Sequence, residues 1–147
     1  MIKSDTKRKQ IKTMFAMLKA YGAKEINISF DGSGDSGSID SVNIYNGEKN
    51  INPDFSVEYT ETSSRYSDGK WVETHTSVIK PVKDALEMVC YDMLQETGID
   101  WYNNDGGFGE LRVDLDSGEV GLEVNSRYTE YNTDTFNFNE DLEEKEE

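Results

Sequence analysis

Two glycine-rich acidic segments hold the side chains whose types and spacing could support chemistry. The first, Gly32–Gly37, reads GSGDSG and has the G-x-G-x-x-G spacing of loops that bind dinucleotide phosphates. Such a loop must lead into a helix whose N-terminus binds the pyrophosphate, whereas a strand pattern follows here. Asp31 and Asp35 would in addition repel phosphate. The motif therefore does not indicate a nucleotide site.

The same segment could instead hold a metal ion. Asp31, Ser33 and Asp35 have the spacing of the first three ligands of a calcium loop, because alternate residues can direct oxygen atoms at one cation. The Gly and Glu that an EF-hand loop requires at its sixth and twelfth positions are absent, which excludes an EF-hand. A looser Mg²⁺ or Ca²⁺ site that includes Asp105 or Glu110 stays open, and with it a metal-dependent hydrolase or nuclease.

The second segment, Trp101–Glu110, reads WYNNDGGFGE. Its closely spaced glycines permit backbone conformations that other residues avoid, and Trp101 and Phe108 are large for a simple spacer. The segment is either a well-packed structural loop or part of a binding surface. Both segments adjoin strand patterns, so they could lie side by side in the folded chain.

Other common catalytic arrangements lack their residues. His75 and Cys90 could in principle form a nucleophile pair, but Cys90 lies on the apolar stripe of a predicted helix and is expected to be a buried thiol. The sequence contains no C-x-x-C, H-E-x-x-H or G-x-S-x-G motif. We therefore expect no zinc, haem or other cofactor.

The elements that must position these segments follow from the spacing of apolar residues. Helical spacing and a following glycine predict a helix over 5–21, and a broad apolar stripe predicts a second that begins at Pro81 and ends before Gly98. Alternation predicts strands around 26–30, 42–44, 55–59, 71–79, 111–115 and 120–124, with a loop at 61–70 and an edge strand near Phe136. The expected α+β fold is an antiparallel sheet with two helices packed on one face, in the order α-β-β-β-β-α-β-β.

The charge is unevenly distributed along the chain. The sequence has 147 residues with 15 basic and 30 acidic side chains, a formal net charge of −15. Seven basic residues and one acid fall within residues 1–24, so the rest of the chain carries a net charge of −21. We predict a single acidic domain over 1–139 and a disordered acidic tail over 140–147.

Cysteine use and hydropathy bear on the compartment. A single cysteine cannot form an internal disulfide, and no apolar run reaches the length of a membrane span or of a signal peptide core. The expected location is therefore the cytoplasm, without membrane attachment.

The residues Phe30–Gly37 (FDGSGDSG) and Asn103–Glu110 (NNDGGFGE) resemble the motifs of an uncharacterised domain family found mostly in phages, plasmids and other bacterial mobile elements. The similarity spans roughly 20–130 and leaves out a polar stretch around 50–70. It implies a mobile-element origin and a bacterial host cytoplasm, and it implies no activity. Such an origin favours a protein that counters host defence or host nucleic-acid machinery.

These observations favour a non-enzymatic, DNA-mimic-like binding protein that inhibits a host nucleic-acid-binding or defence protein by docking on its basic surface. The acidic body itself should not bind DNA. The candidate binding residues are Asp31, Asp35, Asp40, Trp101, Asp105, Phe108, Glu110, Asp114 and Asp116. The alternatives left open are the metal-dependent hydrolase or nuclease and an accessory structural protein whose acidity serves solubility.

Overall fold

The structure is a computed structural model that describes residues 5–33, 36–98, 106–126 and 132–139. Its elements, in chain order, are α1 (Asp5–Tyr21), β1 (Glu25–Ser33), β2 (Ser36–Asn46), β3 (Lys49–Ile51), β4 (Ser56–Ser67), β5 (Lys70–Pro81), α2 (Val82–Thr97), β6 (Gly107–Asp114), β7 (Glu119–Ser126) and β8 (Asn132–Asn137). The predicted tail over 140–147 lies outside the described residues.

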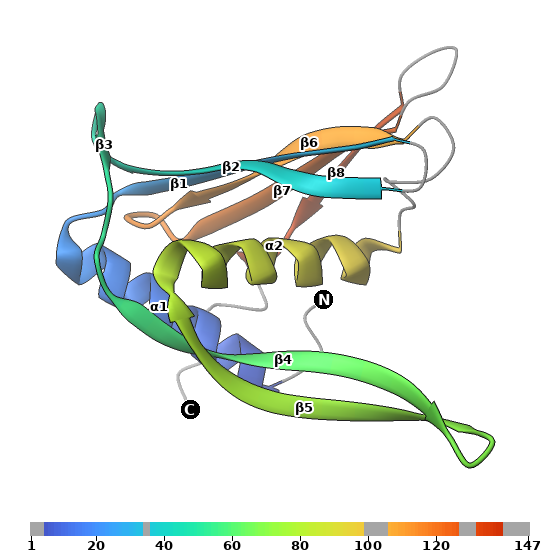
Figure 1. Cartoon of the computed structure of the whole chain (residues 1–147). Coiled ribbons are helices and arrows are strands. Elements are labelled where there is room, and N and C mark those ends of the chain that lie inside the picture. The colour runs from blue at the N-terminus through green and yellow to red at the C-terminus, as the bar shows by residue number, and fades with distance from the viewer. Residues whose placement is uncertain (1–4, 34–35, 99–105, 127–131, 140–147) are drawn as a thin grey trace.

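Six of the strands form one antiparallel sheet with the order β3-β2-β1-β6-β7-β8. Both helices lie against one face of this sheet (Figure 1). The predicted α+β class and the order of helices and strands are therefore confirmed. The edge strand expected near Phe136 is present as β8, and the short strand β3 is an addition. None of the described helices is long and apolar enough to cross a membrane.

The core lies between this sheet and the helices. Alternate residues of the strands point into it, among them Ile26 and Ile28 of β1 and Leu122 of β7, all fully buried. The core is completed from the other side by the buried residues of the two helices. These are Ile11, Met14 and Leu18 of α1 and Val82, Ala85, Leu86, Val89, Cys90, Met93 and Leu94 of α2. The apolar stripes in the sequence thus become the buried faces of the helices, as their spacing requires.

The remaining two strands form a separate hairpin, β4 paired with β5 along twelve residues each. The hairpin runs beneath α2, so that α2 lies between it and the six-stranded sheet (Figure 1). Pairing continues to Ser67 and Lys70, with Asp68 and Gly69 forming the turn at φ values of 52° and 78°.

The predicted loop at 61–70 is therefore wrong. Most residues of the outer half of the hairpin are exposed on both faces, so they need no apolar alternation and carry none. Strand structure there depends on cross-strand pairing that starts from the tight turn, whose glycine and aspartate accept positive φ.

The start of α2 differs from the prediction, and its end agrees with it. Pro81 was expected to be its first helical residue, but it has an extended backbone (φ −50°, ψ 144°) and is the last residue of β5. Its fixed φ suits both a strand end and a helix start, which the sequence alone does not distinguish. At the other end Gly98 adopts the left-handed conformation expected of a helix-ending glycine (φ 71°).

Candidate functional site

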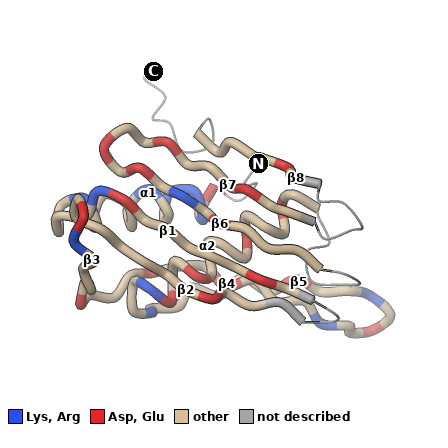
Figure 2. The backbone as a smooth tube through the Cα atoms, turned by 90° about the horizontal axis from the view of Figure 1, so that it is seen from above, with Lys and Arg blue, Asp and Glu red and all other residues tan. Residues whose placement is uncertain are grey.

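The six-stranded sheet has a second face that no described helix covers (Figure 1). We call it the open face. The alternation that buries Ile26 and Ile28 directs Glu25, Asn27 and Ser29 to this side. Strand pairing then adds polar residues of the other strands: Ser41, Asn43 and Tyr45 of β2, Glu110, Arg112 and Asp114 of β6, Glu119, Gly121, Glu123 and Asn125 of β7, and Thr133, Thr135 and Asn137 of β8. Figure 2 looks down on the open face, with acidic positions in red.

The half of the open face formed by β1, β2 and β3 is mainly neutral. The hydroxyls of Ser29 and Ser41 lie 2.6 Å apart across the two strands, and the Asn43 amide donates to Ser41 Oγ at 3.4 Å. Asn50 of β3 donates to Asn43 Oδ1 at 3.1 Å. These side chains satisfy one another, so this half is a continuous neutral hydrogen-bonded strip.

The half formed by β1, β6 and β7 is acidic. Pairing places Glu25 opposite Asp114, Asp114 opposite Glu119, and Glu110 opposite Glu123. Like charges directly opposite each other on adjacent strands destabilise a sheet. The acidic side chains of this face therefore lower the stability of the sheet.

Arg112 offsets part of this repulsion. Its guanidinium Nη2 donates to Glu110 Oε1 at 2.7 Å, and its Nε lies 3.8 Å from Glu25 Oε1. The Arg112 side chain remains 60% exposed, so these ion pairs are largely hydrated and contribute little net stability. The face keeps a net negative charge.

The turn end of the acidic half is hollowed to a volume of about 480 Å³. Glu25, Asp114, Asp116 and Glu119 contribute carboxylates to its lining, which also includes Lys24, Gly47, Arg112, Val120, Gly121, Asn137 and Asn139. A Cβ atom at Gly121 would meet nothing within 4 Å. Packing therefore does not demand this glycine, and its lack of a side chain leaves space in the hollow.

The structure assembles part of the candidate site expected from the sequence. Glu110, Asp114 and Asp116 belong to the acidic half, and the pairing of Gly32 with Gly107 makes the described ends of the two glycine-rich segments neighbours, as anticipated. Asp31 of β1 lies opposite Phe108 of β6, at the next register position along these strands. Asp40 is exposed at the register shift between β1 and β2, beside the acidic half rather than in it. Asp35, Trp101 and Asp105 lie outside the described residues.

Three acids of the open face were missed in the sequence: Glu25, Glu119 and Glu123. Glu25 and Glu119 directly precede the first apolar residue of their strands, and Glu123 lies between Leu122 and Val124. This alternation indicated the face of each side chain but not its neighbours. The strand pairings β1–β6 and β6–β7 bring them to Glu110 and Asp114.

One glycine of the second segment has a structural role. A Cβ at Gly109 would lie 1.9 Å from the Glu123 carbonyl oxygen and 2.9 Å from Cζ of the Phe30 ring. Contacts this short do not occur, so Phe30 can fill the core only because residue 109 has no side chain. This glycine is explained by packing and not by ligand binding.

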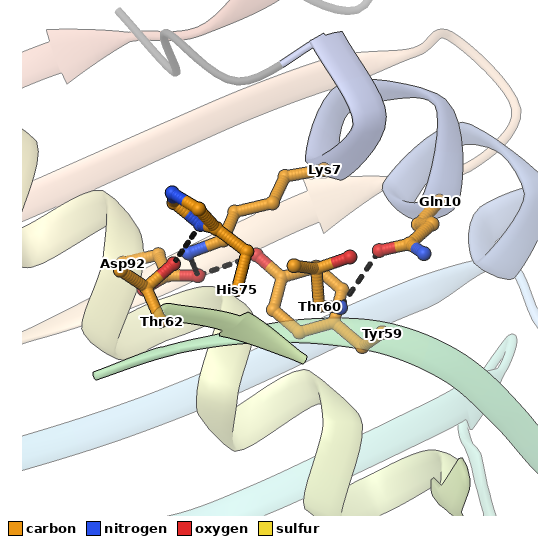
Figure 3. Close-up of polar contacts among 7 residues, drawn as sticks. All are labelled: Lys7, Gln10, Tyr59, Thr60, Thr62, His75 and Asp92. Carbon is orange, nitrogen blue, oxygen red and sulfur yellow. Dashed lines mark hydrogen bonds and ion pairs between the residues drawn. The ribbon is translucent and has the colours of Figure 1, made fainter. Parts of the chain in front are cut away.

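A second polar cluster lies between the helices and the hairpin (Figure 3). The fully buried Tyr59 donates its O–H to Asp92 Oδ2 at 2.6 Å, and Lys7 Nζ lies 3.0 Å from the same oxygen. Burial, with the charge of Asp92 beside it, raises the pKa of Tyr59 above its ordinary range. Tyr59 therefore acts as a hydrogen-bond donor and not as a base, and the cluster joins β4 to α1 and α2.

Gln10 makes a further connection between α1 and β4. Its Oε1 accepts the backbone N–H of Thr60 at 2.8 Å, and its Nε2 donates to Glu58 at 3.2 Å. Further along the hairpin, His75 Nδ1 lies 3.2 Å from Thr62 Oγ1 (Figure 3). The Nε2 atom of His75 lies 3.8 Å from Glu73 Oε2. His75 is exposed, and Cys90 is buried in α2 as predicted, so they do not form a nucleophile pair.

Within the described part of the chain, no group of three His, Cys, Asp or Glu side chains is placed to hold a metal ion. Two of the proposed ligands, Asp35 and Asp105, fall outside that part. The other two, Asp31 and Glu110, are diagonal neighbours on β1 and β6.

The fold and the open face define an α+β protein with an acidic sheet face that none of the described helices covers. The chain matches the model of DUF6878, a family of unknown function, over residues 6–139, and it belongs to that family. No curated protein and no solved structure matches it.

Proposed function

We propose that this protein is an acidic binding protein of phage or mobile-element origin. Its open face docks on the basic surface of a host nucleic-acid-binding or defence protein and inhibits that protein by occupying its nucleic-acid site. The observation that carries the proposal is the set of like-charge pairs on the open face, Glu25 with Asp114, Asp114 with Glu119, and Glu110 with Glu123. A stability cost on an uncovered face is consistent with a use for the charge in binding.

The spacing of these carboxylates supports charge mimicry. Neighbouring strands of a sheet lie about 4.8 Å apart, and residues on one face of a strand repeat about every 7 Å. Acids on β1, β6 and β7 therefore form a dense and rigid array of negative charge. Double-stranded DNA presents about one charge per 1.7 Å of helix axis, and a channel built for it is lined with lysine and arginine. The carboxylates of the open face can take the place of DNA phosphates opposite these basic side chains.

The test uses two triple variants with the same net charge. The open-face variant carries Glu110→Gln, Asp114→Asn and Glu123→Gln, and the control carries Glu48→Gln, Asp54→Asn and Glu61→Gln at exposed positions elsewhere. Asp114→Asn retains Oδ1, which accepts the N–H groups of Asp116 and Ser117 in the turn. Both variants should therefore fold.

Wild type and both variants are immobilised in parallel and incubated with bacterial lysate, and bound proteins are quantified by mass spectrometry. We expect wild type and control to retain the same basic partner and the open-face variant to lose it. Double-stranded DNA should release the partner, and the protein should lower the partner's DNA affinity in fluorescence anisotropy. Equal loss of the partner by the two triple variants would show that total charge, and not the open face, is responsible, and wild-type retention by the open-face variant would overturn the proposal.

The competing proposal is a metal-dependent hydrolase or nuclease that uses Asp31, Glu110, Asp35 and Asp105, favoured by the diagonal placement of the first two. A metal that binds only the folded state raises the melting temperature by mass action. A saturable rise of several degrees with Mg²⁺, Mn²⁺ or Ca²⁺, abolished by Asp31→Asn, would favour the hydrolase over the binding protein.

A further inference from the structure

A groove with apolar walls and a basic rim lies between α1 and the β6–β7 turn. It has a volume of about 220 Å³ and is lined by Lys12, Phe15, Ala16, Lys19, Val113, Asp114, Leu115, Gly118 and Val120. Phe15 is partly buried at its side, and Val113, Leu115 and Val120 belong to the core behind it. The groove thus offers an apolar site beside two ammonium groups.

The basic rim comes from one stripe of α1. Lys12, Ala16 and Lys19 follow at intervals of four and three residues, so they share a helix face, and the two lysines are about 10 Å apart along the axis. The one acid in the lining, Asp114, accepts the N–H groups of Asp116 and Ser117 with its Oδ1 at 3.0 and 3.1 Å. Two lysines against one acid leave the lining with a net positive charge. The groove is therefore suited to an acidic segment with an apolar side chain.

The described chain ends beside this groove. After β8, Phe138 is buried in the core and its N–H donates to the Val120 carbonyl at 3.0 Å. Asn139 Oδ1 accepts the Val120 N–H at 2.7 Å. Val120 lines the groove, so residue 140 must start from a point fixed next to it.

The sequence that follows has the matching chemistry. Residues 140–147 read EDLEEKEE, with six acids, one lysine and a single large apolar residue, Leu142. Three residues span at most about 10 Å when the chain is extended. Leu142 is therefore close enough to Asn139 to reach the groove. Carboxylates on either side of Leu142 are spaced closely enough to meet both lysines of the rim.

We propose that residues 140–147, which we call the acidic segment, dock on this groove of their own chain. Leu142 inserts between Phe15, Leu115 and Val120, and the flanking carboxylates pair with Lys12 and Lys19. Because the segment is tethered at Asn139, its effective concentration at the groove is high even though each contact is weak. The segment then covers the basic side of α1 and keeps other anions, nucleic acid included, away from it. This inference does not depend on the proposed function of the open face.

The first experiment compares backbone amide NMR shifts of the full chain with those of a chain that stops after Asn139. We expect differences concentrated at Phe15, Lys19, Leu115 and Val120. Leu142→Ser in the full chain should move these shifts toward the truncated values, and so should 1 M salt, which shortens the Debye length to about 3 Å. Shifts that are unchanged at the groove, or spread evenly over the molecule, would overturn the proposal.

The second experiment adds a peptide of residues 138–147 to the truncated chain. Lys12→Glu with Lys19→Glu should weaken its binding at least tenfold. Lys9→Glu with Lys49→Glu makes the same change in net charge at exposed positions outside the groove and should change binding less than threefold. Equal weakening by the two pairs would contradict a specific groove. Full-chain shifts that depend on protein concentration would mean that the segment of a second copy, and not the chain's own, fills it.

Discussion

The six-stranded sheet and the β4–β5 hairpin are both antiparallel and have long strands, but they are held in different ways. The sheet buries one face along nearly its whole width, with Ile28, Leu111 and Leu122 at the centre of the core. In the hairpin the described buried residues are Val57, Tyr59 and Thr60 of β4, all near its base. Strand pairing forms the hairpin, but its packing on the rest of the chain depends on these few residues.

The outer half of the hairpin has contacts between its two strands but little burial. Tyr66 and Trp71 pack edge to face with ring centroids 5.6 Å apart, yet Trp71 is 74% exposed. Two-stranded hairpins are marginally stable in water unless they pack on something else. The body therefore supplies the stability of the hairpin through its base, where Tyr59, Asp92 and Lys7 meet.

The largest effect that separates the two regions is expected from core truncation. Leu122 is 0% exposed at the centre of the sheet, and Leu122→Ala should lower the free energy of unfolding by about 3 kcal/mol through lost burial and a new cavity. Val72→Ala in the hairpin, where the side chain is 41% exposed, should cost less than about 0.5 kcal/mol. Urea denaturation followed by circular dichroism measures both. Similar costs would mean that the outer hairpin is buried by something other than this chain.

A smaller effect is expected from breaking the contact that joins the two regions. The Lys7 and Asp92 side chains are 10% and 24% exposed, so Asp92→Ala removes a carboxylate that lies 3.0 Å from a mostly buried ammonium. We expect a loss of about 2 kcal/mol, less than for a fully buried pair. The hairpin should also become sensitive to limited proteolysis.

Glu96→Ala, in the last turn of the same helix, is the matched control. It removes an acid that opposes the helix dipole and should cost almost nothing. If the Asp92 variant unfolds like wild type and its hairpin resists protease, the cluster does not hold the hairpin.

The smallest effect is a pH dependence confined to alkaline conditions. Because the folded-state pKa of Tyr59 is raised above its ordinary 10.0, the unfolded chain loses this proton first as pH rises. The contribution of Tyr59 to the free energy of unfolding is therefore complete below about pH 10 and is lost above it, by about 1.4 kcal/mol per pH unit. Tyr59→Phe should flatten the decline in urea midpoints measured between pH 10 and 11.

Cys90 adds a similar and separable dependence. Burial raises the pKa of Cys90 to about 12, so its contribution to stability is lost as pH rises from about 9 toward 12. Cys90→Ala removes this part and leaves that of Tyr59. A decline that is equally steep in the Tyr59→Phe, Cys90→Ala double variant would trace the pH dependence to other groups.

Several features of the chain could be derived from local pattern. The bounds of α1, the stripe of α2, the turn at Asp116–Gly118 and the apolar strand positions all follow from residue spacing. The same alternation gave the face on which Glu110 and Asp114 lie. The loop expected at 61–70 failed because an exposed ribbon leaves no apolar pattern to detect.

What only the tertiary structure decided is which distant residues meet. The sequence determined the two-sided character of each strand, since the pleat of the backbone sends neighbouring side chains to opposite faces. It did not determine that β1 pairs with β6 and β6 with β7, which places Glu25, Glu119 and Glu123 beside Asp114 and Glu110. It also did not place Lys7 and Tyr59 on one oxygen of Asp92. Local periodicity is a property of neighbouring residues, whereas strand order and register minimise the free energy of the whole core, so a surface made of several strands exists only once the core has formed.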